Sequence, residues 1–242
     1  MVRHILVTGA GSGIGAAIAR RFAEAGDNVA LCARSAEGIE RVASALYGAS
    51  GRLLTLTGDV SARTDAERIV RSAEESLGPV DVLVNNAGIY PAGSIADFRE
   101  SDLDDILDTN VKGVVWMTRC VLHGMAERRR GRIVNVSSVD GQTPGRCNSI
   151  YSASKAAVNS FTRSAALESA PYGVLVNAVA PGWVATEKVK AGVRWRDALS
   201  EIPLGRLAEP EEIAGAVFFL CSADASYITG EILSVNGGIY MG

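Results

Sequence analysis

Strand-like and helix-like segments alternate along almost the whole 242-residue chain, and this alternation restricts its possible folds more than any other feature. Short apolar runs such as HILVTGA at 4–10, NVALCAR at 28–34 and GRIVNVSS at 131–138 are typical of buried strands. Longer segments with helical spacing separate these runs. Strands that are apolar on both faces, each followed by a helix, indicate a parallel sheet with helices on both sides.

Seven segments are expected to form the strands of this sheet, which makes the fold class α/β and doubly wound. They are 4–10, 28–34, 52–60, 80–88, 131–138, 173–182 and 231–238. The helices are expected at about 14–26, 36–48, 65–78, 108–129, 151–170 and 210–222. Periodicity is weakest at 183–209, which predicts a loop or a small helical lid. No repeat, low-complexity tract or linker interrupts the pattern, so residues 1–242 are expected to form one domain.

The first predicted strand ends in the glycine-rich turn TGAGSGIG, residues 8–15. Gly9, Gly13 and Gly15 allow a sharp turn into a helix whose first N–H groups can face a pyrophosphate. The turn follows a strand and opens a helix, which is the context that dinucleotide binding requires. A plain strand-to-helix connection would use the same residues. No lysine follows the glycines, which argues against a nucleoside triphosphatase. The pattern therefore favours a Rossmann-type fold.

The second predicted strand ends at Ala33, and Arg34 follows it. An acidic residue here would bind the ribose diol of NAD, whereas arginine favours a 2′-phosphate. The sequence therefore predicts that NADP(H) is preferred. NAD(H) remains possible if Arg34 is only a surface residue. Asp59, after the third strand, is expected at the edge of the adenine ring, unless it is simply a solvated turn residue.

Charge and composition exclude several classes of function. The net charge of −3 gives no reason to expect nucleic acid binding. One basic run, ERRRGR at 127–132, is either a solvated helix end or a docking patch for an acidic partner. Four scattered cysteines and two histidines predict no metal site. The longest apolar run, IAGAVFFLC at 213–221, is too short to span a membrane, so we expect a cytoplasmic protein.

Five motifs, in this order, resemble those of the short-chain dehydrogenase/reductase superfamily in its compact single-domain branch. They are TGAGSGIG, NNAG at 85–88, Asn110 in DTNVKG, Ser138 in VNVSSVDG, and YSASK at 151–155. The resemblance extends over essentially the whole chain, including APG at 180–182. The C-terminal half, from PLGRLAEPEEIAG onward, is most similar to the 3-oxoacyl-[acyl-carrier-protein] reductase-like members.

The resemblance implies a role for each matching residue. The catalytic group would be Asn110, Ser138, Tyr151 and Lys155. The cofactor phosphates would contact Gly9, Ser12, Gly13, Ile14 and Gly15, and the adenine would contact Asp59 and Val60. The adenosine ribose and the floor of the site would be formed by Asn86, Ala87 and Gly88. The nicotinamide end would contact Pro181, Gly182, Val184 and Thr186, together with Tyr151 and Lys155. It also implies a homotetramer whose subunits pair through the helices at 108–129 and 151–170.

Tyr151 and Lys155 lie four residues apart, so a helix places them on one face. A nearby ammonium group favours the phenolate and lowers the tyrosine pKa from about 10. Lowering that pKa by ~3 units requires roughly 4 kcal/mol, which Lys155, a positive nicotinamide ring and a desolvated site could supply together. Tyr151 would then exchange a proton with a carbonyl or alcohol oxygen. By resemblance, Ser138 would polarise that oxygen, Lys155 would hold the nicotinamide ribose, and Asn110 would hold a water that supplies protons.

The substrate pocket is expected to draw on 90–96, 139–149 and the lid. Its candidate residues are Ser138, Asp140, Cys147, Asn148, Tyr151 and Trp183. The expected function is an NADP(H)-dependent ketoreductase of the 3-oxoacyl carrier-protein type, acting on a small ketone or alcohol that is free or carrier-bound. Tyr172 stands where carrier-protein reductases are expected to have a second basic residue. Three alternatives stay open: an NAD-dependent secondary-alcohol or cyclic-diol dehydrogenase, a non-catalytic NADP-binding regulator, and a lyase or epimerase.

Overall fold

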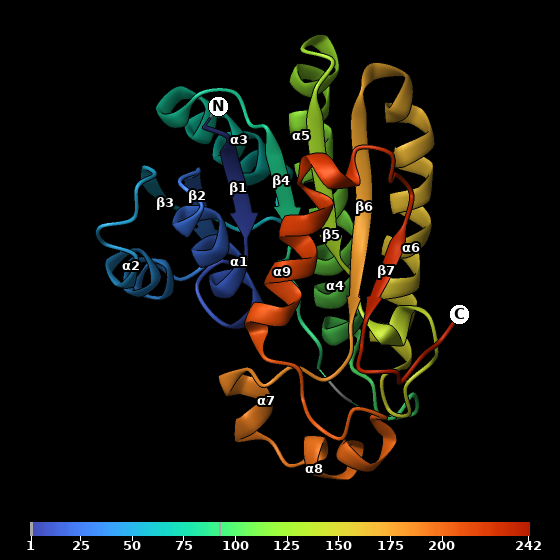
Figure 1. Cartoon of the computed structure of the whole chain (residues 1–242). Coiled ribbons are helices and arrows are strands. Elements are labelled where there is room, and N and C mark those ends of the chain that lie inside the picture. The colour runs from blue at the N-terminus through green and yellow to red at the C-terminus, as the bar shows by residue number, and fades with distance from the viewer. Residues whose placement is uncertain (1, 92) are drawn as a thin grey trace.

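The computed structural model describes residues 2–91 and 93–242. It forms one parallel seven-stranded sheet in the order β3-β2-β1-β4-β5-β6-β7, with helices packed on both faces (Figure 1). The strands are β1 His4–Thr8, β2 Asn28–Ala33, β3 Leu53–Thr57, β4 Val82–Asn85, β5 Gly131–Val136, β6 Val174–Pro181 and β7 Ile232–Val235. The predicted doubly wound α/β fold with a single domain is therefore confirmed.

The helices follow the strands in regular alternation. They are α1 Gly13–Glu24, α2 Ala36–Ala45, α3 Arg63–Leu77, α4 Glu100–Leu107, α5 Gly113–Glu127, α6 Ser149–Ser169, α7 Glu187–Ala191, α8 Arg194–Ala198 and α9 Pro210–Leu220. A π-helical turn, η1 Asp108–Lys112, joins α4 to α5, and short 3₁₀ turns are η2 Val139–Gly141, η3 Ala170–Tyr172, η4 Leu199–Glu201 and η5 Ala223–Ala225.

Two apolar cores enclose the sheet, one on each face. On one face, the buried side chains of Ile18 and Phe22 from α1 pack in one cluster with Ile213 and Val217 from α9. On the other face, α3, α5 and α6 contribute a second cluster that includes Ile69, Met117 and Ala165. The inner strands β1, β4, β5 and β6 are buried from both sides, which explains why their sequences are largely apolar rather than alternating, whereas the edge strands β3 and β7 are only partly covered.

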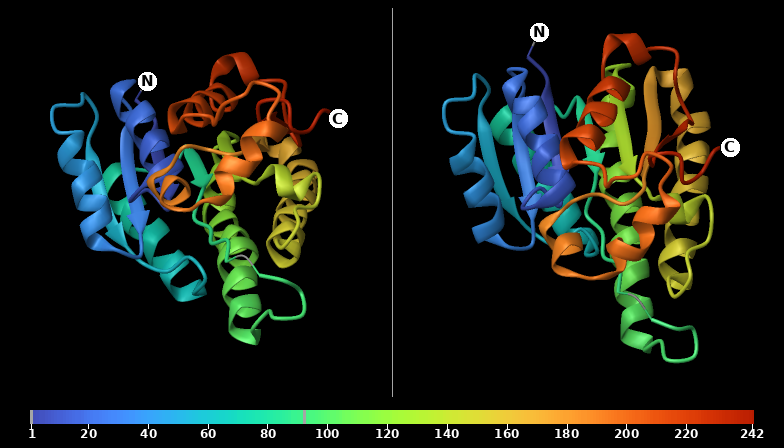
Figure 2. Two further views of the ribbon diagram at one scale, coloured as in Figure 1. Left: turned by 90° about the horizontal axis from the view of Figure 1, so that it is seen from below. Right: turned by 60° about the horizontal axis from the view of Figure 1, so that its bottom comes forward.

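The strand order reverses between β1 and β4. Ile5 of β1 pairs with Val29 of β2 on one side and with Val82 of β4 on the other. In sheets of this kind the crevice at the carboxyl ends of the two strands where the order reverses is the usual ligand site. The segment with α7 and α8 lies across the same end of the sheet (Figure 2).

The expected start of the long helix at 108 is wrong, because helical structure begins eight residues earlier, at Glu100. The early turn is stabilised by Arg99, whose guanidinium pairs with Asp102 at 2.6 Å, and by the buried side chain of Ile106. The π-helical turn then changes the register before α5 begins. The weakly periodic stretch 183–209 contains α7, α8 and η4, so it is partly helical, and its role as a lid stays a prediction. Within the described ranges, no helix has both the length and the apolar character needed to cross a membrane.

Candidate active site

The glycine-rich turn leaves β1 and enters α1 in a conformation that requires glycine. Gly9 has φ 66° and Gly13 has φ 53°, both in the left-handed region. A side chain on Gly15 would collide with the carbonyl oxygen of Gly9. Ser12 is the N-cap residue of α1, and Ile14 lies in its first turn, so the free N–H groups of this helix point out of the turn. The turn is thus built to let a ligand approach backbone N–H groups.

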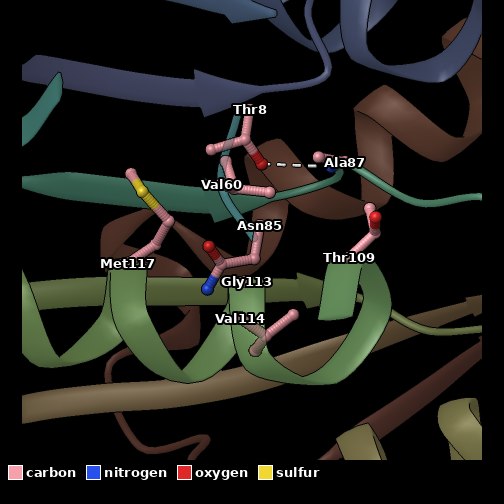
Figure 3. Close-up of a pocket in the computed structure, with 8 residues that line it drawn as sticks. All are labelled: Thr8, Val60, Asn85, Ala87, Thr109, Gly113, Val114 and Met117. Atoms are coloured by element: carbon pink, nitrogen blue, oxygen red, sulfur yellow. Dashed lines mark hydrogen bonds between the residues drawn. The ribbon is translucent and has the colours of Figure 1, made fainter. Parts of the chain in front are cut away.

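Thr8 and Asn86 hold the turn against β4. Asn86 Nδ2 donates to the carbonyl oxygens of Thr8 at 2.9 Å and Gly9 at 3.2 Å. The Thr8 hydroxyl accepts the N–H of Asn86 at 3.0 Å. It also accepts the N–H of Ala87 at 3.1 Å (Figure 3). Sequence reasoning did not single out Thr8. A hydroxyl residue directly before the glycine at the end of a buried strand was the available signal.

The floor of the crevice is closely packed beneath this turn. Figure 3 shows a small pocket between the ends of β1 and β4 and the start of α5, lined by Thr8, Val60, Asn85, Ala87, Thr109, Gly113, Val114 and Met117. Val60 is buried there and packs against Gly113. Ser138 and Tyr151 do not line this pocket, so it belongs to the floor of the crevice rather than to the region around Tyr151.

Arg34, directly after β2, is exposed, and Ala33 is half-buried at the strand end. A second arginine, Arg41 of α2, reaches the turn, where its Nη2 donates to the carbonyl oxygen of Gly11 at 3.5 Å. Gly38 lets α2 approach so closely, because an added Cβ there would lie 3.3 Å from the same oxygen. Sequence reasoning missed Arg41. The signal was a mid-helix glycine three residues before it, on the same helix face.

Asp59 lies just beyond β3, where its Oδ1 accepts the N–H of Ser61 at 2.9 Å and the Ser61 hydroxyl at 2.7 Å. Its own N–H donates to Asp65 at 2.8 Å. These bonds fix the carboxylate at the edge of the crevice. Its second oxygen makes no hydrogen bond to the described residues.

Lys155 and Tyr151 lie on the face of α6 that is turned toward the sheet. Lys155 is only 4% exposed, its Nζ donates to the carbonyl oxygen of Val136 at 2.8 Å, and it lies 5.8 Å from the centre of the Tyr151 ring. An added Cβ at Gly88 would lie 3.6 Å from Lys155 Nζ and 3.3 Å from Asn110 Oδ1. The lysine ammonium therefore lies between Tyr151 on one side and the Gly88–Asn110 region on the other.

Burial changes the acidity of both groups. It lowers the pKa of Lys155 to about 8. It also raises the pKa of Tyr151, and the Asp140 carboxylate and Tyr90 add to that increase. A hydrogen bond with Ser138 works in the opposite direction but does not offset the burial. The direction for Tyr151 is thus opposite to the predicted one, because desolvation of a phenolate outweighs the stabilisation that the protein's own groups provide.

Asn110 lies in the π-helical turn, fully buried, with its amide committed to neighbouring segments. Its Nδ2 donates to the carbonyl oxygen of Ile89 at 2.9 Å and to Ser154 Oγ at 3.1 Å. Its Oδ1 accepts the N–H of Ile89 at 2.9 Å. The side chain therefore joins the loop after β4 to α6. Both amide hydrogens are used, so the predicted water could not accept a bond from them.

Of the candidate substrate residues, hydrogen bonds link Ser138, Asp140 and Asn148 near Tyr151. The Ser138 hydroxyl accepts the N–H of Asp140 at 3.1 Å, and Asn148 Nδ2 donates to Asp140 Oδ2 at 3.1 Å. Cys147 is exposed and has φ 59°. Tyr90 meets the Tyr151 ring edge-on, with centroids 6.1 Å apart. Trp183 is half-buried, and its carbonyl oxygen accepts the N–H of Ala208.

The start of the lid touches the glycine turn. Thr186 caps α7 by accepting the N–H of Val189 at 3.3 Å, and an added Cβ at Gly13 would lie 3.0 Å from the Thr186 methyl group. Pro181 ends β6, and the N–H of Gly182 donates to Val235 at 3.1 Å. Val184 pairs with Ala208. The residues predicted at the nicotinamide end therefore lie in the segment that joins β6 of the sheet to α7 of the lid.

A parallel sheet with a glycine turn at its reversal point, beside a half-buried tyrosine and a buried lysine, is the arrangement of a dinucleotide-dependent oxidoreductase. A family model described as short chain dehydrogenase matches residues 3–197. The chain belongs to this family, and it acts on CH–OH or carbonyl groups.

Relatives of known name span nearly the full length of the chain. The 3-oxoacyl-[acyl-carrier-protein] reductase of Vibrio cholerae is 43% identical over 98% of this chain and 96% of its own length. The protein of the same name from Escherichia coli is 40% identical over 98% of this chain and 96% of its own. An uncharacterized oxidoreductase of Thermotoga maritima is 41% identical over 97% of this chain and 96% of its own.

Proposed function

We propose that the protein is an NADPH-dependent ketoreductase of the 3-oxoacyl carrier-protein reductase type. The observation that carries this proposal is the grouping of Tyr151 and Lys155, whose Nζ lies 5.8 Å from the centre of the tyrosine ring, with Ser138 close enough to the phenol to lower its pKa. The names of the relatives support the substrate class. A non-catalytic regulator would have no need of a buried lysine 5.8 Å from a half-buried phenol ring.

The residues of the crevice fit a dinucleotide. Gly9 and Gly13 have positive φ, and Gly15 lies so close to Gly9 that a side chain there would collide with it. These three glycines form a backbone cradle that side chains would fill. Arg34 and Arg41 provide two cations beside this cradle, which favours the 2′-phosphate of NADP(H). Asp59 and Val60 would flank the adenine, while Pro181 to Thr186 would flank the nicotinamide. When bound, the nicotinamide supplies or accepts the hydride.

Tyr151 donates its phenolic proton to the substrate oxygen as the carbonyl is reduced, and takes the proton back in the reverse direction. Ser138 donates a hydrogen bond to the same oxygen. Lys155 stabilises the phenolate that forms, and its lowered pKa lets it exchange a proton near neutral pH. Because the pKa of Tyr151 is raised in the protein alone, a further positive charge near the ring is needed for the phenolate to form readily.

The substrate is proposed to be a ketone that is free or attached to a carrier protein. The basic run at 127–132 lies between α5 and β5, at the amino edge of the sheet and so opposite the crevice. Arg128 and Arg129 donate to the carbonyl oxygens of Val80 and Pro171, and Arg130 pairs with Asp81 at 2.6 Å. These contacts give the run a structural role within one subunit. Tyr172 is 51% exposed at the neighbouring corner.

A homotetramer is proposed from the surface of α6. Its outward face is a stripe of small residues that ends in a leucine 80% exposed: Ala153, Ala156, Ala157, Ser160, Ser164 and Leu167. Small residues let two helices pack closely, and an exposed leucine at one end of the stripe favours burial against a second copy.

Binding of NADPH and NADH, measured in parallel by titration calorimetry, tests the cofactor proposal. We expect NADPH to bind at least about tenfold more tightly, which corresponds to about 1.4 kcal/mol. Arg34→Ala and Arg41→Ala should each weaken NADPH binding and leave NADH binding nearly unchanged. Equal affinities would favour the NAD-dependent alcohol dehydrogenase instead.

Tyr151→Phe should bind the cofactor normally but oxidise no NADPH with any ketone.

A further inference from the structure

Asp140 lies between two of the proposed catalytic residues. It follows Ser138 by two positions, and its N–H donates to Ser138 Oγ at 3.1 Å. Its Oδ2 accepts a hydrogen bond from Asn148, the residue that caps α6, at 3.1 Å. Tyr151 follows three residues later on α6. The carboxylate is therefore attached on one side to the serine and on the other to the helix of the tyrosine.

The surroundings of this carboxylate are partly closed. Asp140 is half-buried, and an added Cβ at Gly145 would lie 2.6 Å from its Oδ1. Burial raises the pKa of Asp140, although the hydrogen bond from Asn148 and the charge of Arg194 lower it. The carboxylate is also close enough to Tyr151 to raise the pKa of the phenol.

Acceptor capacity on Asp140 remains unused. Among the described residues, Asn148 is the one side chain found to donate a hydrogen bond to the carboxylate. An ionised carboxylate offers about four lone-pair sites. An alkyl group placed beside it would remove water without supplying a donor, which is unfavourable. A hydroxyl or ammonium group on the substrate would supply one, as a charge-assisted hydrogen bond.

The position of that donor follows from Ser138. The serine hydroxyl both accepts the Asp140 N–H and, in the proposed mechanism, binds the reacting oxygen. The carboxylate on the same residue as this N–H is therefore near the carbons attached to the reacting carbonyl. We propose that Asp140 is a specificity-determining residue, which accepts a hydrogen bond from a hydroxyl or ammonium group on the carbon next to the carbonyl. This inference rests on the proposed ketoreductase activity with a free ketone, not on a 3-oxoacyl substrate, and names hydroxyketones or aminoketones as the preferred substrates.

A purely structural role for Asp140, holding the loop 143–148 through Asn148, gives a different expectation. Loss of that contact would reduce turnover of every ketone by a similar factor. A role in specificity changes the ratio of kcat/KM between two ketones that differ only in the donor. The ratio is thus a measurement that a structural role alone does not alter.

The test compares ketones in which a hydroxyl replaces a methyl group: hydroxyacetone against butanone, and phenacyl alcohol against propiophenone. Four full-length proteins are assayed, each with NADPH and with NADH: the wild type, Asp140→Asn, Asp140→Val and Asp224→Asn. Asp224 is an exposed carboxylate in η5, before β7 and at the amino edge of the sheet, so it is a control for the loss of one charge. Thermal melting of each variant reports whether it is folded.

We expect the wild type to favour the hydroxyl member of each pair by about tenfold or more. The ratio should fall in Asp140→Asn and approach one in Asp140→Val, and both variants should still reduce butanone. Asp224→Asn should keep the wild-type ratio. A wild-type ratio near one overturns the assignment, even if no Asp140 variant folds. So does a ratio that both Asp140 variants retain. Failure of the wild type to reduce any ketone would overturn the proposed function, and this inference with it.

Discussion

At the scale of single residues, Lys155 shows most directly how position determines chemistry. Lys155 is 4% exposed, its ammonium group donates to the carbonyl oxygen of Val136, and among the described residues no carboxylate pairs with it. Such burial disfavours the charged form, which accounts for the lowered pKa. A charged Lys155 therefore reduces the stability of the folded protein while serving its proposed role beside Tyr151.

The pH dependence of stability should reveal this effect. The pKa of Lys155 is about 8 in the folded protein, against an ordinary value of 10.5. Below the folded value both states carry the proton, so the destabilisation is fully present. It is relieved as the pH rises through the folded value, because the unfolded chain then binds more protons. Relative to Lys155→Met, the unfolding free energy of the wild type should rise by about 2 kcal/mol between about pH 7 and about pH 9.5.

Urea unfolding of both proteins at the two pH values measures this change. The range stays below the ordinary tyrosine pKa of 10.0, because the raised pKa of Tyr151 makes stability fall above it. Lys190→Met, at an exposed position on α7, is the control for the loss of one lysine charge. A difference between wild type and Lys155→Met that stays constant with pH would contradict the assignment.

At the scale of helices and strands, a buried polar network fastens the sheet to its covering helices. Asn85 of β4 donates to Asn135 of β5 at 2.9 Å and to Thr118 of α5 at 3.1 Å. Asn135 then donates to Thr162 of α6 at 2.9 Å. Asn135 and Thr162 have no exposed surface, so neither can exchange its partner for water. The network fixes α6, and with it Tyr151 and Lys155, relative to the ends of the strands.

Replacement of Asn135 by alanine should destabilise the protein by about 2–3 kcal/mol, since it leaves a buried donor, Asn85 Nδ2, and a buried acceptor, Thr162 Oγ1, without their partner. Asn85→Ala should be similarly costly. The double variant should lose less than the sum of the single losses, by about 1 kcal/mol, because the two asparagines share one hydrogen bond. Chemical denaturation of the four proteins measures this coupling. Strictly additive losses would show that the two side chains act independently.

The elements themselves were largely predictable from the sequence, because apolar strands and amphipathic helices have different periods. Interruptions of those periods were not. The helical turns from Glu100 onward contain four acidic residues within α4, which weakens their apolar pattern. The π-helical turn at Asp108–Lys112 has no sequence signature of its own, yet it positions Asn110. In the site, motif residues were predictable, whereas Arg41 and Thr8 required knowledge of which segments approach the turn.

At the scale of the whole molecule, the two edges of the sheet have different tasks. The proposed catalytic and cofactor residues lie at the carboxyl edge, under the lid. At the amino edge, arginines hold successive segments together: Arg3 pairs with Asp27 at 2.5 Å, and Arg130 pairs with Asp81 at 2.6 Å. Arg3 also lies 5.3 Å from the ring centres of Phe22 and Phe218, joining β1 to α1 and α9.

The assembly proposed from the α6 surface is open to a direct test. A large charged side chain in the stripe of small residues should prevent close helix packing, so Ala157→Arg should convert tetramers into smaller species. Sedimentation velocity at several protein concentrations measures the change. Ala45→Arg, at an exposed position on α2, is the matched control and should leave the assembly intact. A wild-type protein that sediments as a monomer, or an Ala157→Arg variant that remains tetrameric, would contradict the proposal.

The order of the strands also has a consequence for synthesis on the ribosome. β1 is made before both of its neighbours: β2 follows within the next 25 residues or so, but β4 comes only at Val82–Asn85. Until β4 emerges, the nascent chain carries an unpaired apolar strand edge, which is prone to aggregation. Early folding of the N-terminal half is therefore exposed to misassembly, and molecular chaperones that bind extended apolar segments would act on this chain most effectively during that interval.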